Sequence, residues 1–219
     1  MDFLLAAPGM GAVAQLCRGS GIGFRKTLES EAERIFKEVG AVAEGHFQLA
    51  SGLHSPVYWE KFRILEQPRY TERLCWMIAE HFRGRSIQLV AGPTTGGVIV
   101  AYEVAKQLGA RSIYAERQDN ARVFRRGFEI AQGERVLVVD DVLTTGGSVR
   151  EVIAEVKRRG GRLVGLGVLV DRSQGEMDFG TPLFSCLRTV VPTYKPEECP
   201  LCGEGKPLVK PGSGESPSS

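Results

Sequence analysis

Between residues 87 and 170 the chain alternates short, uniformly apolar segments with amphipathic ones. The apolar segments lie at 87–91, 113–116, 135–140 and 163–170, and segments with helical spacing lie at 98–107 and 149–159. Uniformly apolar strands that alternate with helices are typical of a parallel sheet covered on both faces. The pattern therefore predicts an α/β fold in which a parallel sheet is flanked by helices.

The residues before this core predict a helix, a pair of strands and a second helix. Ser30 and Glu33 have the spacing of a capping box at a helix start, and Gly40 predicts the end of that helix. Strands are expected at 47–49 and 57–62 around a turn, and Pro68 predicts the first turn of an amphipathic helix. We expect this part of the chain to cover the core.

The two ends of the chain show no persistent periodicity. Residues 1–24 combine a short apolar run with several glycines and predict a loose extension. The chain length suits one main domain, expected at 25–198 with a small hood at 41–65. The remainder, 199–219, predicts a tail with a C-x-x-C pair, and its last dozen residues are rich in Pro, Gly and Ser and should be disordered.

Composition restricts the partners. A formal charge of +2 is far from the basic excess of a nucleic-acid binder, so a small anionic ligand is expected instead. The apolar runs are too short for a membrane span, and the run at 3–7 lacks the basic flank of a signal peptide. Five scattered cysteines predict reduced thiols, with Cys75 in the core, and the cytoplasm as compartment.

A group of polar residues follows the apolar strand at 135–140. Asp140 and Asp141 come first, and Thr144, Thr145, Gly146, Gly147 and Ser148 then lead into a helix. Ligands of open α/β folds bind where such strands end. Paired carboxylates can accept hydrogen bonds from sugar hydroxyls and lie near a hydrated divalent cation, while the hydroxyls and free helix amides suit a phosphate. The alternative is a helix cap beside two solvated aspartates, which the ordered coincidence of these features disfavours.

A second loop, at 91–97, repeats this arrangement. Thr94, Thr95 and Gly96 follow an apolar strand and precede a helix, so their amides could hold a second anion. A merely structural turn is the alternative. No lysine follows the glycines of the first loop, which excludes a Walker phosphate loop there.

The first loop resembles the PRPP-binding motif of the type I phosphoribosyltransferases. The resemblance narrows to the orotate phosphoribosyltransferases, runs from about residue 29 to 207, and is carried by 45–56, both loops and 170–172. It implies PRPP and orotate as substrates, Mg²⁺ bound through PRPP and water near Asp140 and Asp141, and a homodimer. The two aspartates would hold the ribose hydroxyls, the first loop the 5-phosphate and the second loop the pyrophosphate.

Further residues are assigned by the same resemblance. Arg172 lies where the family binds orotate, and a guanidinium can pair with a carboxylate through two hydrogen bonds. Thr144 and His54 are also expected to contact the acceptor. The polar segment 117–127 resembles the family's flexible catalytic loop. Its arginines would bind PRPP or neutralise the leaving group unless the segment is only a solvated turn; they are Arg117, Arg122, Arg125 and Arg126.

The chain departs from several relatives at individual positions. These relatives carry lysines and a histidine in the polar loop and lysines where Gly96 and His54 stand. The sequence therefore leaves two other functions open, which are transfer to a purine base and PRPP sensing by a regulator without catalysis. A regulator would need a DNA-binding domain or a broad basic face, and neither is visible in the sequence.

Two other motifs carry less weight. Residues 9–14 fit a dinucleotide-binding pattern, but no crossover unit surrounds them. Cys199 and Cys202 form half of a zinc knuckle, whereas a structural zinc site needs four ligands, and the three histidines lie at least 118 residues away. An ordinary turn is favoured for the pair. A zinc site completed by a second chain or by Cys186, and a redox pair, remain alternatives.

Overall fold

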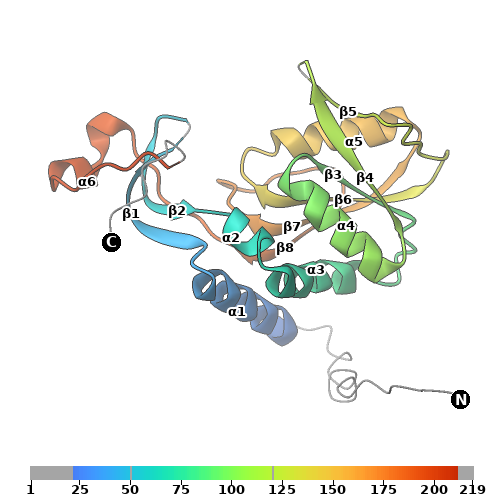
Figure 1. Ribbon diagram of the computed structural model, residues 1–219, viewed down its shortest axis with the longest axis horizontal. Coiled ribbons are helices and arrows are strands. Elements are labelled where there is room, and N and C mark those ends of the chain that lie inside the picture. Colours follow the sequence, from blue (N-terminus) through green and yellow to red (C-terminus); the bar gives the residue numbers. More distant parts are fainter. Residues whose placement is uncertain (1–21, 50, 120, 212–219) are drawn as a thin grey trace, which may run out of the picture.

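A six-stranded sheet forms the centre of the computed structural model, which describes residues 22–49, 51–119 and 121–211 (Figure 1). Its strands are β3 (Leu89–Pro93), β4 (Arg111–Gln118), β5 (Ala121–Phe124), β6 (Arg135–Leu143), β7 (Arg162–Asp171) and β8 (Leu183–Arg188). They lie in the order β5-β4-β3-β6-β7-β8, and every pair except β4–β5 is parallel. The predicted fold class, a parallel sheet flanked by helices, is confirmed.

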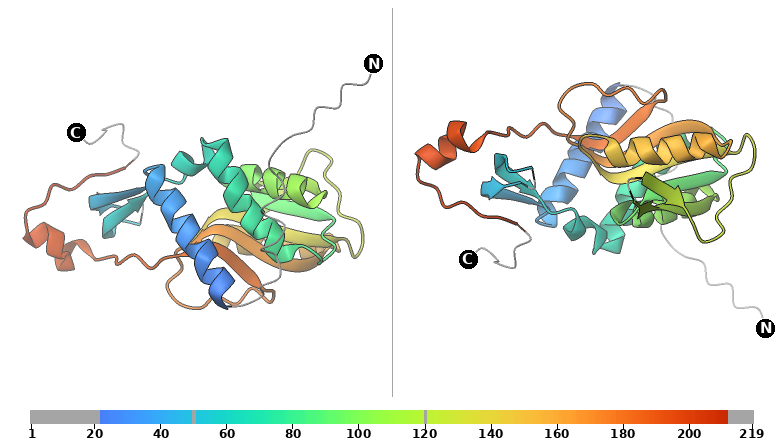
Figure 2. Two further views of the ribbon diagram at one scale, coloured as in Figure 1. Left: turned by 90° about the horizontal axis from the view of Figure 1, so that it is seen from below. Right: turned by 90° about the horizontal axis from the view of Figure 1, so that it is seen from above.

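Helices cover both faces of this sheet. α1 (Ile22–Glu38), α3 (Pro68–Phe82) and α4 (Gly96–Leu108) pack on one face, and α5 (Gly147–Arg158) packs on the other (Figure 2). Side chains alternate along β6, so Leu137 and Val139 join the first core and Val136 and Val138 the second. This explains why the strand is apolar at each position from Val136 to Val139.

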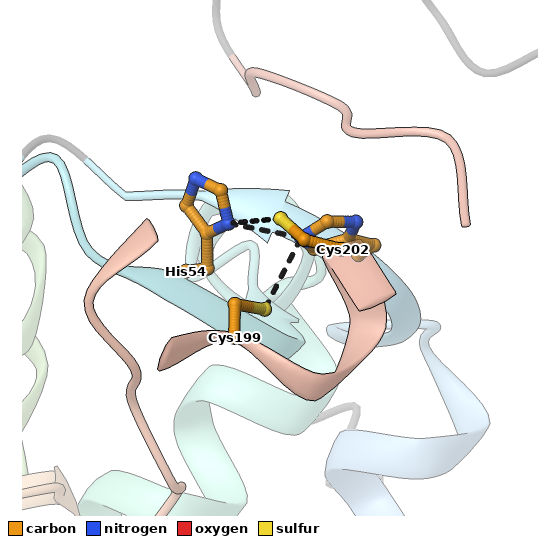
Figure 3. A group of neighbouring side chains, drawn as sticks. His54, Cys199 and Cys202 are labelled. Atoms are coloured by element: carbon orange, nitrogen blue, oxygen red, sulfur yellow. Dashed lines mark hydrogen bonds between the residues drawn. The ribbon is translucent and has the colours of Figure 1, made fainter. Parts of the chain in front are cut away.

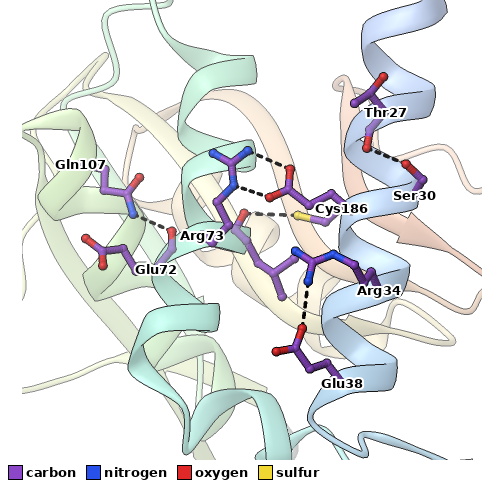
Figure 4. Close-up of polar contacts among 10 residues, drawn as sticks. Thr27, Ser30, Arg34, Glu38, Glu72, Arg73, Gln107 and Cys186 are labelled. Carbon is purple, nitrogen blue, oxygen red and sulfur yellow. Dashed lines mark hydrogen bonds and ion pairs between the residues drawn. The ribbon is translucent and has the colours of Figure 1, made fainter. Parts of the chain in front are cut away.

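Polar contacts connect the helices of the first face. Arg73 on α3 donates two hydrogen bonds of 2.8 Å to the Glu31 carboxylate on α1 (Figure 4). Gln107 on α4 donates to the backbone carbonyl of Glu72 on α3 at 3.0 Å. Cys186 on β8 lies under α3 and approaches the Leu74 carbonyl at 3.3 Å.

The first helix starts earlier than predicted. It begins at Ile22, so Ser30 lies inside α1, and its hydroxyl donates to the Thr27 carbonyl instead of capping the helix (Figure 4). The expected extension 1–24 therefore loses its last three residues to the helix, and 1–21, with the dinucleotide-like pattern, lies outside the described residues. The predicted end is confirmed, because Gly40 adopts a left-handed φ of 66° after the last turn.

The hood is a two-stranded antiparallel hairpin. It consists of β1 (Val42–Gln48) and β2 (His54–Trp59), followed by α2 (Phe62–Leu65), so both strands begin earlier than expected. The chain returns to this hairpin after β8 through η1 (Pro196–Glu198) and α6 (Pro200–Gly203), which lie beside it in Figure 1. Of the last dozen residues, 212–219 lie outside the described ones, but Val209 is paired with Phe47 and is not disordered.

Two further strands correct the prediction for the core. Part of the expected loop 117–127 is a hairpin, in which β4 runs to Gln118 and pairs with β5. β7 is also not the last strand, because β8 adds parallel to it at the sheet edge. Cys75 is fully buried, as predicted. Among the described residues, no helix is both long and apolar enough to cross a bilayer.

Candidate active site

A polar cavity of about 300 Å³ opens at the carboxyl ends of β3, β6 and β7. Its walls are Trp59, Lys61, Pro93, Thr94, Thr95, Gly96, Arg122, Asp140, Asp141, Val142, Thr144, Ser148 and Arg172. Nine of these residues are predicted site residues, drawn from four strand ends far apart in the sequence. A larger hollow of about 610 Å³ lies between α1 and α3, but it contains neither glycine-rich loop and neither aspartate of the pair.

The two predicted anion loops begin helices on opposite faces of the sheet. Thr94 and Thr95 precede α4, and Thr144 to Ser148 surround a small recess of about 40 Å³ at the start of α5. Gly146 caps α5 in the left-handed conformation, with a φ of 77°. Both helix starts direct free amides and the positive end of the helix dipole toward the site, which suits two anionic groups.

Arg122 connects the two loops. From β5 its guanidinium donates to the Thr94 carbonyl and hydroxyl, both at 3.1 Å, and to the Ser148 hydroxyl at 3.2 Å. Its Nε lies 3.7 Å from Glu151 on α5. One largely buried cation thus contacts both places where an anion would bind.

The paired aspartates are buried at the end of β6. Asp140 is 7% exposed and Asp141 3% exposed, and each carboxylate accepts the amide of the following residue, at 2.8 and 2.7 Å. Burial, and then the charge of Asp141, raises the pKa of Asp140 well above its ordinary value. The pair is therefore strained electrostatically and would gain from a cation or from hydroxyl donors.

Lys61 supplies the nearest positive charge, and sequence reasoning missed it. Its Nζ lies 2.8 Å from Asp141 Oδ2, as an ion pair without good hydrogen-bond geometry. The side chain comes from the segment that follows β2, so the hood contributes directly to the cavity. Gly96 makes room for this arrangement, since a Cβ there would lie 1.7 Å from Asp141 Oδ2.

Arg172 follows β7 and is partly buried in the cavity wall. Its Nε is buried and has no hydrogen-bond partner among the described residues, as is also the case for Trp59 Nε1. Burial lowers the pKa of the Arg172 guanidinium, against the opposing effect of Tyr58. A desolvated guanidinium without a partner favours binding of a carboxylate.

Four predicted site residues line neither the cavity nor the recess at the start of α5. Arg126 and Arg125 pair with Glu116 at 2.8 and 3.9 Å, and Arg117 lies 3.9 Å from Glu151 at the surface. His54 is buried in the hood against other side chains. The catalytic roles of the exposed arginines thus stay predictions that require the β4–β5 hairpin to move, and the expected contact of His54 with substrate stays a prediction that would require the hood to rearrange.

Comparison with known proteins identifies the family to which this cavity belongs. Residues 63–193 match the phosphoribosyl transferase domain. The chain is 53% identical over 179 residues to the orotate phosphoribosyltransferase of Caldanaerobacter subterraneus subsp. tengcongensis, covering 82% of this chain and 94% of the relative. It is 51% identical over 183 residues to that of Pelotomaculum thermopropionicum, covering 84% and 96%.

Solved structures agree. The orotate phosphoribosyltransferase of Aeropyrum pernix superposes with a TM-score of 0.62 at 28% identity, covering 71% of this chain and 92% of that one. That of Mycobacterium tuberculosis gives 0.60 at 26%, covering 75% and 95%. An adenine phosphoribosyltransferase from Thermoanaerobacter pseudethanolicus, at 19% identity and a TM-score of 0.53, shares the fold alone. The chain belongs to the orotate phosphoribosyltransferases, within the phosphoribosyltransferase family.

Proposed function

We propose that this chain transfers the 5-phosphoribosyl group of PRPP to orotate, giving orotidine 5′-monophosphate and pyrophosphate. The observation that carries the proposal is one cavity with two anion loops, a carboxylate pair between them, and at Arg172 a partly buried guanidinium whose buried Nε has no hydrogen-bond partner among the described residues. PRPP has a phosphate at each end and hydroxyls in the middle, and orotate has a carboxylate. Each chemical group of the two substrates thus has a complementary group in the wall.

The ribosyl group would be held by the loop before α5. In this proposal Thr144 to Ser148 bind the 5-phosphate, Asp140 and Asp141 accept hydrogen bonds from the ribose hydroxyls, and Thr94 to Gly96 bind the pyrophosphate. When the bond between the anomeric carbon and pyrophosphate breaks, positive charge develops on the ring and negative charge on the leaving group. The buried carboxylates and the cation of Arg122 match these two charges.

Orotate would attack the anomeric carbon from the opposite face and invert its configuration. Because the acceptor is already an anion, no strong general base is required among the cavity residues. Arg172 would orient the acceptor by its carboxylate. Closure of the β4–β5 hairpin would exclude water and bring the positive charges of Arg125 and Arg126 to pyrophosphate. Both arginines would then lose their contacts with Glu116.

Mg²⁺ is part of the proposal, and the residues fit it. The buried Asp141 Oδ2 makes no hydrogen bond among the described residues and has only the ion pair with Lys61, and carboxylate oxygens are the ligands that this hard cation prefers. Asp140 and Asp141 would hold it through water and PRPP. When bound, the ion neutralises charge on the pyrophosphate oxygens.

A homodimer in the cytoplasm completes the proposal. Ile99 and Tyr102, one turn apart on α4, are exposed large apolar side chains, and Tyr102 is 67% exposed, which supports a contact with a second chain. The four cysteines in the described part of the chain are free thiols, which suits a reducing compartment.

An absorbance assay with PRPP, Mg²⁺ and a panel of bases tests the function. We expect consumption of orotate and none of adenine or xanthine, because only orotate brings a carboxylate to Arg172. Turnover of a purine would instead identify a purine phosphoribosyltransferase. Binding of PRPP without turnover of any base would identify a sensor.

Arg122→Ala should weaken PRPP binding by about 10-fold or more, because the variant loses charge-assisted contacts worth about 1.5–3 kcal/mol each. Arg158→Ala is the matched control, since Arg158 pairs with Glu155 in the last turn of α5, away from the start of the helix that faces the cavity. Its PRPP affinity should change less than about threefold. Calorimetric titration of both variants checks this, and equal losses would contradict the geometric distinction.

A further inference from the structure

We propose that His46, His54, Cys199 and Cys202 form a structural zinc site that fastens the carboxyl-terminal segment to the hood. The four side chains come from β1, β2 and the start of α6, and one ligand atom from each lies within 4.8 Å of all the others. Figure 3 shows the two cysteines facing His54 across the space between α6 and the hairpin. No spacing in the sequence joins the histidines to the cysteine pair, because they are far apart along the chain. In the fold, His46 and His54 lie beside the two cysteines.

The separations fit a tetrahedral ion. His46 Nε2 lies 3.0 Å from His54 Nδ1, 3.5 Å from Cys199 Sγ and 3.7 Å from Cys202 Sγ, and Cys202 Sγ lies 3.3 Å from His54 Nδ1. Bonds of about 2.1 Å to nitrogen and about 2.3 Å to sulfur would place tetrahedral ligands roughly 3.3–3.8 Å apart, which three of these four separations match, while the two nitrogens lie closer together. Two imidazoles and two thiolates are also a ligand set that zinc favours.

A hydrogen bond on the far side of His46 orients it as a ligand. Its Nδ1 lies 2.9 Å from the Lys206 carbonyl oxygen, which can only accept, so Nδ1 carries the proton. Nε2 is then unprotonated and directed at both sulfurs and at His54. Ligating histidines are commonly held in this way by a backbone carbonyl behind the ring.

The backbone around the four side chains is already fixed. Gln48 donates to the Val209 carbonyl and Val209 donates to the His46 carbonyl, both at 2.8 Å. His54 exchanges two backbone hydrogen bonds with Tyr194, at 2.8 and 2.9 Å. The segment 194–209 thus meets both hood strands next to the ligands, and His46, His54 and Cys199 are buried.

The two alternatives for the cysteines explain less. An ordinary turn would not require the two histidines, but two buried imidazoles face the thiols. The four side chains include no carboxylate that would pair with the imidazoles instead. A redox pair would form a disulfide between Cys199 and Cys202 and would use neither imidazole, although both thiols lie against the two rings. Zinc binding uses all four groups, with the thiols releasing their protons to solvent.

The ion would act at a distance from the chemistry. His54 begins β2 and Trp59 ends it, so five residues, roughly 17 Å of strand, separate the zinc ligands from the cavity wall. Its effect would be to hold the hairpin that delivers Trp59 and Lys61 to the cavity. All four zinc positions are filled by protein, which is typical of a structural and not a catalytic site.

Metal analysis of the full chain, purified under reducing conditions without added metal or a histidine tag, is the first test. We expect about one zinc per chain, with two sulfur and two nitrogen ligands in X-ray absorption spectra. Replacement by Co²⁺ should give the thiolate charge-transfer and visible bands of a tetrahedral site. A reduced protein that carries no zinc and does not take it up would overturn the proposal, and so would a Cys199–Cys202 disulfide in that preparation.

Single variants then assign the ligands. Cys202→Ser and His46→Gln should each weaken zinc binding by more than roughly 100-fold, because loss of a mere outer partner already costs 10–100-fold. The controls are His81→Gln and Cys75→Ala, which remove a histidine and a cysteine outside the cluster and should keep the zinc. Cys202 is exposed, so its variant should fold, and retention of zinc by Cys202→Ser and His46→Gln would place the ion elsewhere.

Hydrogen exchange separates a fastening role from incidental binding. Removing zinc with a chelator should speed exchange of the Gln48 and Val209 amides, which join the hood to the carboxyl-terminal segment. Amides in the centre of β6 should be unaffected. If exchange of the two hood amides does not change on chelation, the ion does not hold this segment.

Discussion

Replacing Asp140 and Asp141 together by asparagine should reduce turnover by more than about a thousandfold while the fold persists. Both carboxylates form the wall of the cavity at the end of β6, where ring charge would develop. Asparagine keeps their size but cannot supply negative charge or hold a divalent cation. Steady-state kinetics and circular dichroism check this, and normal activity in the double variant would contradict the assignment of the donor site.

The stability of the single variant Asp140→Asn has a predictable sign. Burial, and then Asp141, raises the pKa of Asp140 above its ordinary value of 3.8. The folded chain therefore binds more protons than the unfolded one, and stability falls as pH rises from the unfolded pKa to the folded pKa. Above that window the penalty persists, so Asp140→Asn should melt at the same or a higher temperature than the parent at neutral pH.

Asp178→Asn is a control for both measurements. Asp178 is exposed and lies outside the cavity walls. Its variant should keep the activity of the parent, and it should melt at the same temperature as the parent at neutral pH. A lower melting temperature for Asp140→Asn at neutral pH would mean that Asp140 supports the fold and not the ligand.

Arg172→Ala should weaken orotate binding by roughly 10- to 150-fold, since a charge-assisted contact contributes about 1.5–3 kcal/mol. Affinity for PRPP should change less than about threefold. The buried Arg172 Nε without a partner is the structural reason to expect a selective effect. Calorimetry with each substrate, and with pyrophosphate present for orotate, provides the measurement.

Two further variants give this prediction its controls. Arg172→Lys keeps the charge but not the planar pair of donors, so it should recover only part of the affinity. Arg188→Ala removes an arginine from the adjacent strand end, where Arg188 pairs with Asp171 outside the cavity, and should bind orotate normally. Equal weakening of both substrates by Arg172→Ala would show that this residue supports the sheet edge.

The parallel core was predictable because its strands are buried on both faces. The interior of such a strand, as Val136 to Val139 in β6, is apolar at every position, which distinguishes it from the amphipathic helices beside it. β5 was missed because an exposed two-stranded extension needs no apolar run. The polar residues Arg122 and Arg125 made this segment look like a loop in the sequence. The start of α1 was misplaced because Ser30 and Glu33 also suit an exposed helix interior, where Glu33 pairs with Lys37.

Site residues that follow a strand locally could be predicted, whereas those brought in by tertiary packing could not. Asp140, Thr144 and Thr94 could be found because local order along the chain places them after strands. Lys61 could not, since its position in the cavity depends on how the hood packs against the sheet, and no local motif marks it. The cluster around Cys199 was missed for a related reason, because a ligand set assembled from three elements has no spacing to recognise.

The return of residues 194–209 to the hood has a consequence for the order in which the protein is completed. Cys199 follows its neighbour His46 by 153 residues. At about 5–20 residues per second, translation takes roughly 8–30 s to cover that interval. During this time the β1–β2 hairpin is synthesised but lacks its last partner, while every strand of the large sheet is made before Cys199. A chain that ends prematurely just before Cys199 would therefore contain the whole sheet and an unfinished hood.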